Sequence, residues 1–394
     1  MDSLNFNDTE SSFAYKPDSE LLHDYQIFRL ISQRWLVEIG TRAAVHFLHW
    51  GIKTPLALGM RPTVYAVFCG GDTLKLASKK ISRLHQYGVQ SVLDYGVEGK
   101  ETEEDFQRTT AAIKEAITFA KDNAAVDIVC SKFTGLIPFS ILEKLQRGDT
   151  LSENEMAVYN LSKERIYMLA QFAFDNGVSL FVDAEESWIQ KPLDALTLDL
   201  MAKFNKEKPI IYNTVQLYRK DRLAFFKNAV EQAQKAGFIY AAKLVRGAYM
   251  EKESAHAKAT HTENPIQDNK AATDRDYNEA LAFAINNIKQ VAICVATHNE
   301  ESTLLATQYM HQHNLPKNHP HIHFSQLLGM SDNVSFNLAK SGYNASKYMP
   351  YGPVADVIPY LIRRAQENTS VAGQMGRELK LLKTEIKRRR LWTL

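Results

Sequence analysis

Polar and charged side chains stand at the ends of short apolar segments in many places along the chain. If the fold brings those ends together, a lysine, a carboxylate, an amide and an aromatic ring would share one site. Such a set can bind and orient a small amino or keto acid, although each residue alone is equally typical of a solvated strand end. The residues are Lys132, Asp183, Gln216, Lys243, Arg246, Thr297, His298, Asn299, Gln326 and Tyr348.

Two adjacent arginines, Arg363 and Arg364, add a second kind of chemistry. A guanidinium binds a carboxylate through two parallel hydrogen bonds, a geometry that lysine cannot reproduce. Glu367 follows them by four and three residues, so its carboxylate can meet either guanidinium on one face of a helix. An ordinary surface ion pair explains this spacing equally well. The functional interpretation is a clamp for the carboxylate of a small substrate.

These residues alone leave the reaction open. A Schiff-base aldolase that uses Lys132 or Lys243 is compatible with them, because a desolvated lysine beside another cation can become nucleophilic. A non-catalytic binding module is disfavoured, because so many of the positions carry reactive or cofactor-binding groups. Nothing in the spacing identifies a flavin.

The elements that would position these residues alternate along the chain. Apolar or β-branched segments are each followed by a longer stretch with helical periodicity, for instance 104–123, 163–176, 222–236 and 271–289, which favours parallel strands with crossover helices. Eight such strands predict an α/β fold of the (β/α)8 TIM-barrel type, with its active site at the carboxyl ends of the strands. No G-x-G-x-x-G follows the first strand, so a Rossmann site has no support. The predicted strands are 91–95, 127–133, 179–183, 210–216, 239–245, 291–297, 321–326 and 346–351.

The segments outside the barrel differ in character. We expect an N-terminal helical arm over 1–90, the barrel over 91–376 and a basic amphipathic tail over 377–394. The tail has seven Lys or Arg against two Glu, with apolar residues at helical spacing. This composition predicts peripheral binding to an anionic membrane surface, although a packed C-terminal helix explains it equally well.

Composition narrows the class of protein. With 45% hydrophobic residues in 394, the chain can bury a large core. The cysteines, Cys69, Cys130 and Cys294, lie in apolar segments without paired or metal-ligand spacing, so we expect reduced core residues. An acidic start and the lack of a long apolar run predict a cytoplasmic protein. Nucleic-acid binding is disfavoured, because an isolated basic tail without a recognition motif is weak evidence for it.

Longer segments resemble the proline dehydrogenase family. KLVRGAYMEKE begins at Lys243, ATHNE at Ala296, FSQLLGM at Phe324, SKYMPYGP at Ser346 and YLIRRAQEN at Tyr360. The weaker segments DAEES at Asp183 and TVQLY at Thr214 precede them in the order that the family has. The resemblance covers residues 65–368, and five such segments in order, each at or after a predicted strand, make it specific.

The resemblance implies a reaction. It implies that FAD takes a hydride equivalent from C5 of L-proline to give Δ1-pyrroline-5-carboxylate, and that a quinone reoxidises the flavin, on the inner face of the cytoplasmic membrane. Bifunctional relatives carry an aldehyde dehydrogenase domain after the barrel. Here 26 residues follow Asn368, so we expect a separate dehydrogenase to oxidise the glutamate semialdehyde.

The resemblance also implies roles for residues that bind the substrate. Arg363 and Arg364 would bind the proline carboxylate, and Glu367 would hold their geometry from the same C-terminal helix over the active site. Tyr348 would pack over the proline ring, where its bulk disfavours a 4-hydroxyl. The remaining substrate residues that the resemblance implies are Lys132 and Asp183 beside the pocket, Leu327 in its wall and Glu98 as a gate that pairs with Arg363.

On the cofactor side, the resemblance places Gln216 near the isoalloxazine, with Gln326 as a further contact. Lys243 stands where bifunctional bacterial members have arginine, so a cation remains but bidentate bonding is lost. The other implied FAD contacts are Arg246 and Tyr249 along the cofactor, and Thr297, His298 and Asn299 at its phosphate and adenosine end. A different flavin barrel, similar to methylenetetrahydrofolate reductase, is disfavoured by the paired arginines and Tyr348.

Overall fold

The computed structural model describes residues 4–50, 53–96, 101–370 and 374–391, and its eight strands close into a parallel barrel in sequence order. Each predicted strand coincides with an observed one to within two residues at either end. The prediction of a (β/α)8 barrel is therefore confirmed. The strands are β1 Val89–Tyr95, β2 Val126–Ser131, β3 Ser179–Val182, β4 Ile211–Gln216, β5 Tyr240–Val245, β6 Val291–Ala296, β7 Ile322–Leu327 and β8 Ala345–Tyr351.

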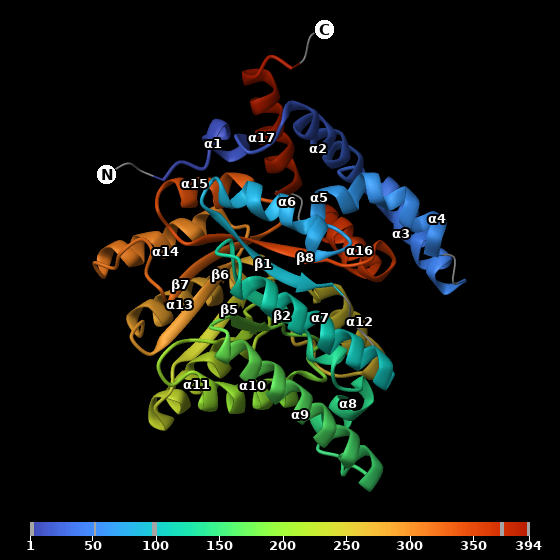
Figure 1. The fold of residues 1–394 in the computed structure, drawn as a ribbon, viewed down its shortest axis with the longest axis vertical. Coiled ribbons are helices and arrows are strands. Elements are labelled where there is room, and N and C mark those ends of the chain that lie inside the picture. The colour runs from blue at the N-terminus through green and yellow to red at the C-terminus, as the bar shows by residue number, and fades with distance from the viewer. Residues whose placement is uncertain (1–3, 51–52, 97–100, 371–373, 392–394) are drawn as a thin grey trace. The chain divides into compact units, whose positions relative to one another are not determined.

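Helices precede the first strand, connect the strands and follow the last (Figure 1). A π-helical turn covers Arg61–Tyr65 and a 3₁₀ turn covers Phe133–Gly135. The helices before β1 are α1 Thr9–Phe13, α2 Asp18–Ile31, α3 Arg34–His49, α4 Lys53–Met60, α5 Ala66–Phe68 and α6 Leu74–His85. Those from β1 to β6 are α7 Glu103–Lys121, α8 Phe139–Arg147, α9 Glu153–Asp175, α10 Gln190–Phe204, α11 Arg222–Ala236, α12 Met250–Thr260 and α13 Lys270–Asn286. The rest are α14 Glu300–Gln312, α15 Asp332–Lys340, α16 Val354–Ser370 and α17 Gln374–Arg388.

Local sequence sets where the connecting helices begin and end. Ser152 and Glu155 form a reciprocal capping box at the start of α9, so two backbone N–H groups that lack helical partners are satisfied. Asn299 caps α14 by accepting a hydrogen bond from the Ser302 backbone N–H at 3.0 Å. Gly237 ends α11 in the left-handed region, at φ 68°, which costs glycine little.

The chain divides into two compact units, 1–91 with 325–394, and 92–324. In the larger unit, 92–324, the strands β2 to β6 pair in parallel register, for example Thr214 beside Lys243 and Lys243 beside Cys294. Apolar faces of the connecting helices cover the strands, as Leu193, Leu196 and Leu200 of α10 do. The strands from β2 to β6 therefore form a rigid support for side chains at their carboxyl ends.

The smaller unit, 1–91 with 325–394, has a hydrophobic core of its own, to which the N-terminal arm, the last helices and the segment after β7 contribute. The core side chains are Phe13, Leu21, Ile27, Phe28, Ile31, Val37, Tyr65, Val67, Phe68, Cys69, Met330, Val354, Val357, Tyr360, Leu361, Leu381, Leu382 and Ile386.

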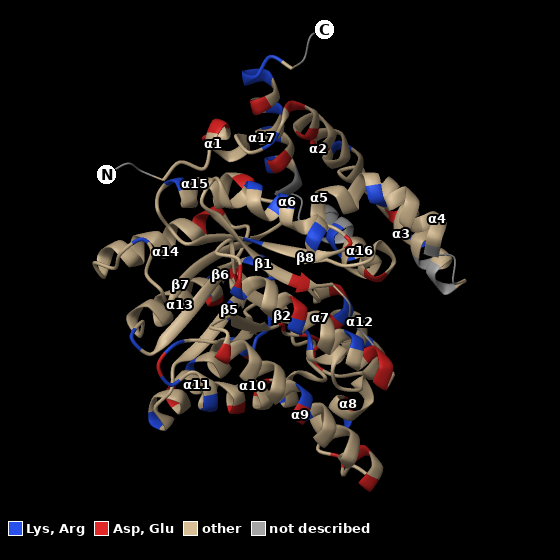
Figure 2. Cartoon of the chain, in the orientation of Figure 1, with Lys and Arg blue, Asp and Glu red and all other residues tan. Residues whose placement is uncertain are grey.

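Of the two explanations for the tail, the structure supports a packed C-terminal helix for its apolar face. Leu381, Leu382 and Ile386 of α17 are buried in the core of the smaller unit, where α17 packs on α2. Arg389 donates hydrogen bonds to Glu385 and Asp18, which anchors the carboxyl end of the helix to the arm. Lys and Arg at the end of α17 are visible in Figure 2. The apolar side of α17, which would have to contact a bilayer, is therefore buried in the fold.

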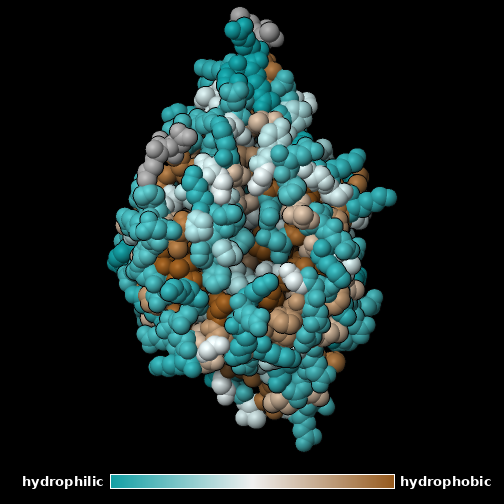
Figure 3. Space-filling view, turned by 60° about the vertical axis from the view of Figure 1, so that its left-hand side comes forward, coloured by the Kyte–Doolittle hydropathy of each residue, from teal (hydrophilic) through white to brown (hydrophobic). Residues whose placement is uncertain are grey.

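All three cysteines are buried and free of disulfides, as the sequence predicted. Burial raises the pKa of Cys294 to about 12, which disfavours the reactive thiolate. On the face shown in Figure 3, hydrophilic side chains predominate and hydrophobic ones form smaller areas. Within the described residues, no helix combines the length and the apolar character needed to cross a membrane.

Two lysines and three acidic side chains are buried together in the smaller unit. Lys16 approaches Asp24 at 2.6 Å and Asp332 at 3.0 Å, and Lys347 approaches Asp332 at 2.8 Å. Glu378 of α17 accepts a hydrogen bond from the Ser331 backbone N–H next to Asp332. Burial, together with the neighbouring Asp332 charge, raises the pKa of Glu378 to about 7. Two cations thus balance two carboxylates, and the third carboxylate favours its neutral form.

Replacing Glu378 with glutamine is expected to make the protein more stable at neutral and higher pH. The pKa of Glu378 is 4.5 in the unfolded chain and about 7 in the folded one, so the folded state binds the extra proton. Stability of the native protein therefore falls as pH rises from 4.5 to about 7 and then levels off, by on the order of 3 kcal/mol. The amide oxygen of the introduced glutamine keeps an acceptor for the Ser331 N–H.

The measurement is the free energy of unfolding of E378Q and of the native protein between pH 4.5 and 8. The difference should grow with pH and become constant above about pH 7. Glu279→Gln removes the same charge from an exposed site on α13 and serves as the control. A pH-independent difference would mean that Glu378 is ionised throughout.

Candidate active site

Four buried charges of alternating sign lie at or near the carboxyl ends of strands in the larger unit. Lys132 follows β2, and its Nζ lies 3.4 Å from Asp94 of β1 and 3.7 Å from Asp183 after β3. Lys243 of β5 donates a hydrogen bond to the other oxygen of Asp183. These side chains are all at most 11% exposed. Three predicted residues, Lys132, Asp183 and Lys243, are therefore brought together.

The electrostatics of this cluster oppose a Schiff-base mechanism. Burial alone would lower the pKa of Lys243, but the Asp183 charge outweighs it, so the pKa lies above its ordinary value. A nucleophilic lysine needs a neutral amine at neutral pH, and hence a lowered pKa. Lys132 also has a carboxylate on either side. The cluster is suited to holding fixed charges.

Asp94 is the member of this cluster that was not predicted from the sequence. It is 1% exposed, and its carboxylate contacts the Lys132 ammonium from β1, whereas Asp183 contacts it from the end of β3. Its signal in the sequence is an acidic residue within an apolar strand, since a buried strand tolerates a charge only beside a partner. Asp94 is therefore a positioning residue for Lys132.

Asp94→Asn is expected to lower kcat/KM for the substrate about tenfold, because Lys132 then has one fewer carboxylate to fix it. Steady-state kinetics, with thermal unfolding to verify the fold, measure the loss. In a Lys132→Met background the Asp94 change should add little. Full additivity of the two losses would show that Asp94 does not act through Lys132.

Gln216 at the end of β4 has a fixed side chain. Its amide nitrogen donates to the Glu185 carbonyl at 2.7 Å and to the Tyr218 hydroxyl at 3.0 Å. Its amide oxygen accepts from Arg219 at 3.2 Å. These three bonds determine which end of the amide faces each neighbour, so Gln216 is preorganised at the carboxyl end of β4.

Arg246 lies beside the amino end of α14. Its guanidinium donates to the Thr297 hydroxyl at 2.6 Å and to the Ser302 hydroxyl at 2.7 Å, and stacks 3.7 Å from the centre of the Tyr277 ring. Asn299, which caps α14, donates its backbone N–H to Thr297 at 3.1 Å. The Arg246 side chain is 15% exposed and also lies 3.3 Å from the Asp274 carboxylate. A partly exposed cation beside the positive end of a helix dipole can hold a phosphate group. Arg246, Thr297 and Asn299 are therefore brought together as one cluster.

Two more predicted FAD contacts lie close in the sequence to Arg246 and Asn299. Tyr249 is 8% exposed and immediately precedes α12, and His298 is half-buried between β6 and α14.

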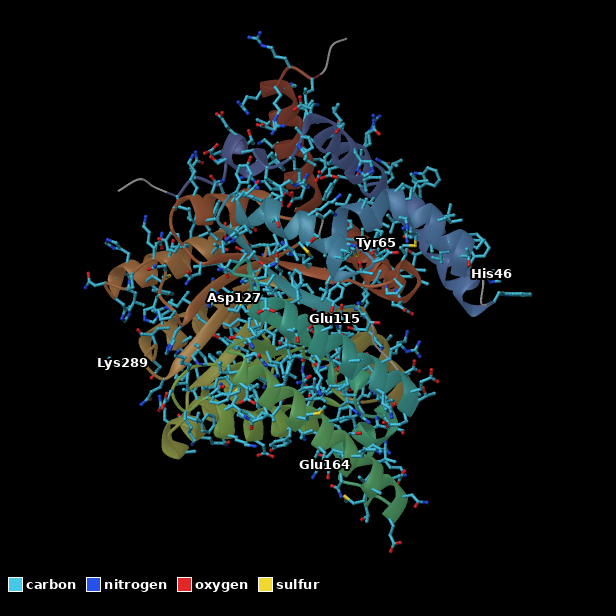
Figure 4. The ribbon with its side chains drawn as sticks, in the orientation of Figure 1. His46, Tyr65, Glu115, Asp127, Glu164 and Lys289 are labelled. Atoms are coloured by element: carbon cyan, nitrogen blue, oxygen red, sulfur yellow. The ribbon has the colours of Figure 1, made fainter. Side chains whose placement is uncertain are left out.

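Asp127 lies at the amino end of β2, where burial raises its pKa (Figure 4). Because Asp127 is near the start of β2 and Lys132 follows its end, Asp127 belongs to the opposite end of β2 from the charge cluster.

The remaining predicted residues lie in the smaller unit. Gln326 is buried and accepts a hydrogen bond from Ser335 at 2.8 Å. Tyr348 and Leu327 are half-buried, and Leu327 packs against the core of this unit. On β8, Tyr348 follows Lys347, so successive side chains point to opposite faces.

The paired arginines lie on α16, in the smaller unit. Arg364 is 9% exposed, and its guanidinium stands 5.3 Å from the centre of the Tyr360 ring, while Arg363 is half-buried. The predicted contacts of Glu367 and Glu98 lie outside the described residues. The roles of the arginines in substrate binding stay predictions.

Solved structures share this fold. Proline utilization A from Bdellovibrio bacteriovorus, inactivated by N-propargylglycine, matches with a TM-score of 0.72 and 20% identity over 94% of this chain. The protein of the same name from Bradyrhizobium japonicum, as the D778Y mutant, matches with a TM-score of 0.66 and 22% identity over 84% of this chain. The chain spans 40% and 34% of those two longer proteins. At these identities the likeness supports the barrel fold alone.

Sequence comparison gives the family. The chain is 32% identical to proline dehydrogenase 1, mitochondrial, of Dictyostelium discoideum, across 97% of this chain and 74% of that protein. It is 31% identical to hydroxyproline dehydrogenase of Xenopus laevis, across 98% and 90%. The family model described as proline dehydrogenase matches residues 77–377, which include every strand and the paired arginines. The chain therefore belongs to the proline dehydrogenase family, whose resemblance the sequence segments had indicated.

Proposed function

We propose that the protein oxidises L-proline at C5 with FAD as cofactor, forms Δ1-pyrroline-5-carboxylate, and passes the electrons to a quinone. The observation that carries this proposal is the buried cluster of Asp94, Lys132, Asp183 and Lys243 at the strand ends, in a barrel of this family. Such a cluster presents fixed charges without a strong nucleophile, as expected where a cofactor supplies the chemistry.

The residues around α14 fit an anionic cofactor. Arg246 supplies a partly exposed cation, and the capped amino end of α14 supplies a positive dipole end. A pyrophosphate would therefore be stabilised by Arg246, Thr297, His298 and Asn299. When bound, FAD supplies the acceptor for a hydride equivalent. The residues proposed for the rest of the cofactor are Gln216, Lys243, Tyr249 and Gln326.

Lys243 would act on the cofactor through charge. The structure has it paired with Asp183, so its ammonium is held in position by a carboxylate and is already partly neutralised. Arginine at this position would offer a fork of donors to a second partner, whereas the Lys243 ammonium acts as a single point of positive charge. We therefore propose an electrostatic contribution from Lys243.

For the substrate, the proposal assigns the carboxylate to the guanidiniums of Arg363 and Arg364, with Glu367 holding their geometry. The apolar wall would come from Leu327 and Tyr348, and Glu98 would pair with Arg363 when substrate binds. A carboxylate clamp and a ring wall fix the substrate at two points, which is what oriented transfer from one carbon requires.

The polar groups beside the ring would orient the substrate amine. Asp183 can attract the proline nitrogen, and Lys132 limits how far that carboxylate moves. Neither group needs to be a strong base, because proline can lose its ammonium proton to water before oxidation. We propose electrostatic and positioning roles for both residues.

The competing substrate is 4-hydroxyproline, because one relative at 31% identity is named hydroxyproline dehydrogenase. We propose L-proline, since the bulk of Tyr348 would crowd a 4-hydroxyl. The test is to compare kcat/KM for L-proline and trans-4-hydroxy-L-proline with an artificial electron acceptor, and to identify the product by mass spectrometry. A higher value for L-proline supports the proposal, and a higher value for hydroxyproline refutes it.

The proposed reaction requires two further partners, one for its product and one for its electrons. The product is in equilibrium with glutamate semialdehyde, so a separate aldehyde dehydrogenase would consume it. A quinone acceptor lies in a membrane, so the enzyme needs access to it. We propose a cytoplasmic protein that binds peripherally to the inner face of the membrane. Oxidation of the proline-reduced enzyme by a soluble quinone analogue, measured in stopped flow, would test the acceptor.

A further inference from the structure

The helix α3 exposes a stripe of large apolar side chains. Trp35 is 61% exposed, Ile39 59%, Phe47 42% and Trp50, just after the helix, 68%. Their spacing of three, four or eight residues keeps them on one side of the helix, with exposed Ala43 between them. Leu58 of α4 is a further exposed apolar side chain, at 67%. We call Trp35, Ile39, Phe47, Trp50 and Leu58 the α3–α4 patch.

The opposite side of α3 already serves the fold. Val37 and Ala44 are buried, and the helix contacts α2, α4 and α16 within the smaller unit. An amphipathic helix of a globular protein normally turns its polar side to water. Here α3 is apolar on the core side and on the exposed side, so the exposed apolar stripe contributes nothing to the core that the structure describes.

The composition of the patch fits a lipid surface better than a second protein. Trp35 and Trp50 stand at its two ends, about 22 Å apart at the rise of an α-helix. Tryptophan prefers the boundary between lipid headgroups and acyl chains, because its ring is apolar and its N–H is polar. Arg42 and His46 are exposed among the apolar positions of α3, and Figure 4 labels His46 on this helix. A protein interface is typically depleted of charge at its centre.

Charge around the patch favours an anionic partner. From Arg29 to Arg61 the sequence has five Lys or Arg and one acidic residue, Glu38, although the whole chain has a net charge of only +2. Arg29, at the end of α2, is exposed, and Arg61 is exposed but paired with Asp72. Each cation near an anionic bilayer adds to binding, and salt screens the effect.

We propose that the α3–α4 patch binds the surface of an anionic lipid bilayer, with its apolar side chains among the headgroups and its arginines at the phosphates. The inference does not depend on the electron acceptor, because it rests on the exposed side chains and local charge alone. It assigns membrane contact to a segment of the N-terminal arm, in place of the tail, whose apolar face is buried.

Co-sedimentation of the full chain with vesicles tests the proposal. The vesicles contain phosphatidylcholine alone or phosphatidylcholine with phosphatidylglycerol. The variant Trp35→Ser/Ile39→Ser/Trp50→Ser removes the core of the patch. A matched control, Met156→Ser/Leu161→Ser/Met168→Ser, removes side chains of 42%, 48% and 41% exposure from α9. Arg29→Glu/Arg42→Glu tests charge without removing apolar surface.

The native protein and the α9 control are expected to bind the phosphatidylglycerol vesicles, more weakly at high salt. The α3 variant should lose at least about tenfold in partition coefficient, since three large apolar side chains leave the interface. The charge variant should lose binding to anionic vesicles, and thermal unfolding should show all three variants folded. Equal binding by the α3 variant and the native protein would overturn the proposal. The proposal would also be overturned if the native protein did not bind vesicles but formed a dimer that only the α3 variant disrupts, since a second copy would then cover the patch.

Discussion

Arg364→Met is expected to lower kcat/KM for L-proline by about three orders of magnitude, which corresponds to roughly 4 kcal/mol of lost binding in the transition state. Arg364 is 9% exposed on α16, so its guanidinium is largely desolvated, and a desolvated charge binds a carboxylate more strongly than an exposed one. Methionine keeps the length of the side chain and removes both the charge and the donors. Steady-state kinetics with an artificial acceptor measure the loss.

Arg364→Lys separates charge from geometry in the same experiment. Lysine keeps the positive charge but cannot make two parallel bonds, so an intermediate loss of about a hundredfold is expected. Arg165→Lys is a matched control, because Arg165 is a buried arginine of α9 that bonds the Leu136 carbonyl and Glu103. Its kcat/KM should stay within threefold of the native value. If Arg364→Met also stayed within threefold, Arg364 would not bind the substrate.

Lys347→Met is expected to destabilise the fold by about 3–5 kcal/mol at neutral pH, because it leaves the buried Asp332 carboxylate with one cation fewer. Lys347 is 0% exposed and also donates to the Met330 carbonyl, so its loss leaves a buried acceptor unsatisfied as well. Tyr15 and Lys16 still contact Asp332, but Lys16 then faces both Asp332 and Asp24. Equilibrium unfolding in denaturant measures the change in free energy.

Two variants show whether charge balance is the cause. Adding Asp332→Asn to Lys347→Met restores one cation against one carboxylate and should regain at least half of the lost stability. Lys227→Met breaks a pair with Glu279 that is 35% and 48% exposed, so it should cost less than about 1 kcal/mol. A loss for Lys347→Met as small as that for Lys227→Met would contradict the interpretation.

The barrel could be predicted from the sequence because its signals are local. Each strand is a short apolar segment such as 179–183, and each crossover helix begins at a cap such as Ser152 or Asn299, so neighbouring residues decide the element. The alternation of strands and helices then fixes the topology of the barrel, and this topology brings the carboxyl ends of the strands together. Lys132, Asp183 and Lys243 could be placed in one cluster for this reason.

What could not be predicted depends on contacts between distant residues. Asp94 and Lys132 are 38 residues apart, and Lys16 and Asp332 are 316 residues apart, so no local pattern marks either pair. The tail carries the composition of a membrane-binding helix, and its burial depends on apolar partners such as Phe28 in the arm. The same composition suits a membrane or a core, and packing alone decides between them.

The visible spectrum of the purified protein tests the proposed reaction most directly, if it is recorded after reconstitution with FAD and again after L-proline is added without oxygen. We expect a flavin spectrum that L-proline bleaches and L-glutamate leaves unchanged, because C5 of the proline ring is the proposed hydride donor. A protein that binds no FAD, or whose flavin spectrum L-proline does not change, would not be a flavin-dependent oxidase of proline.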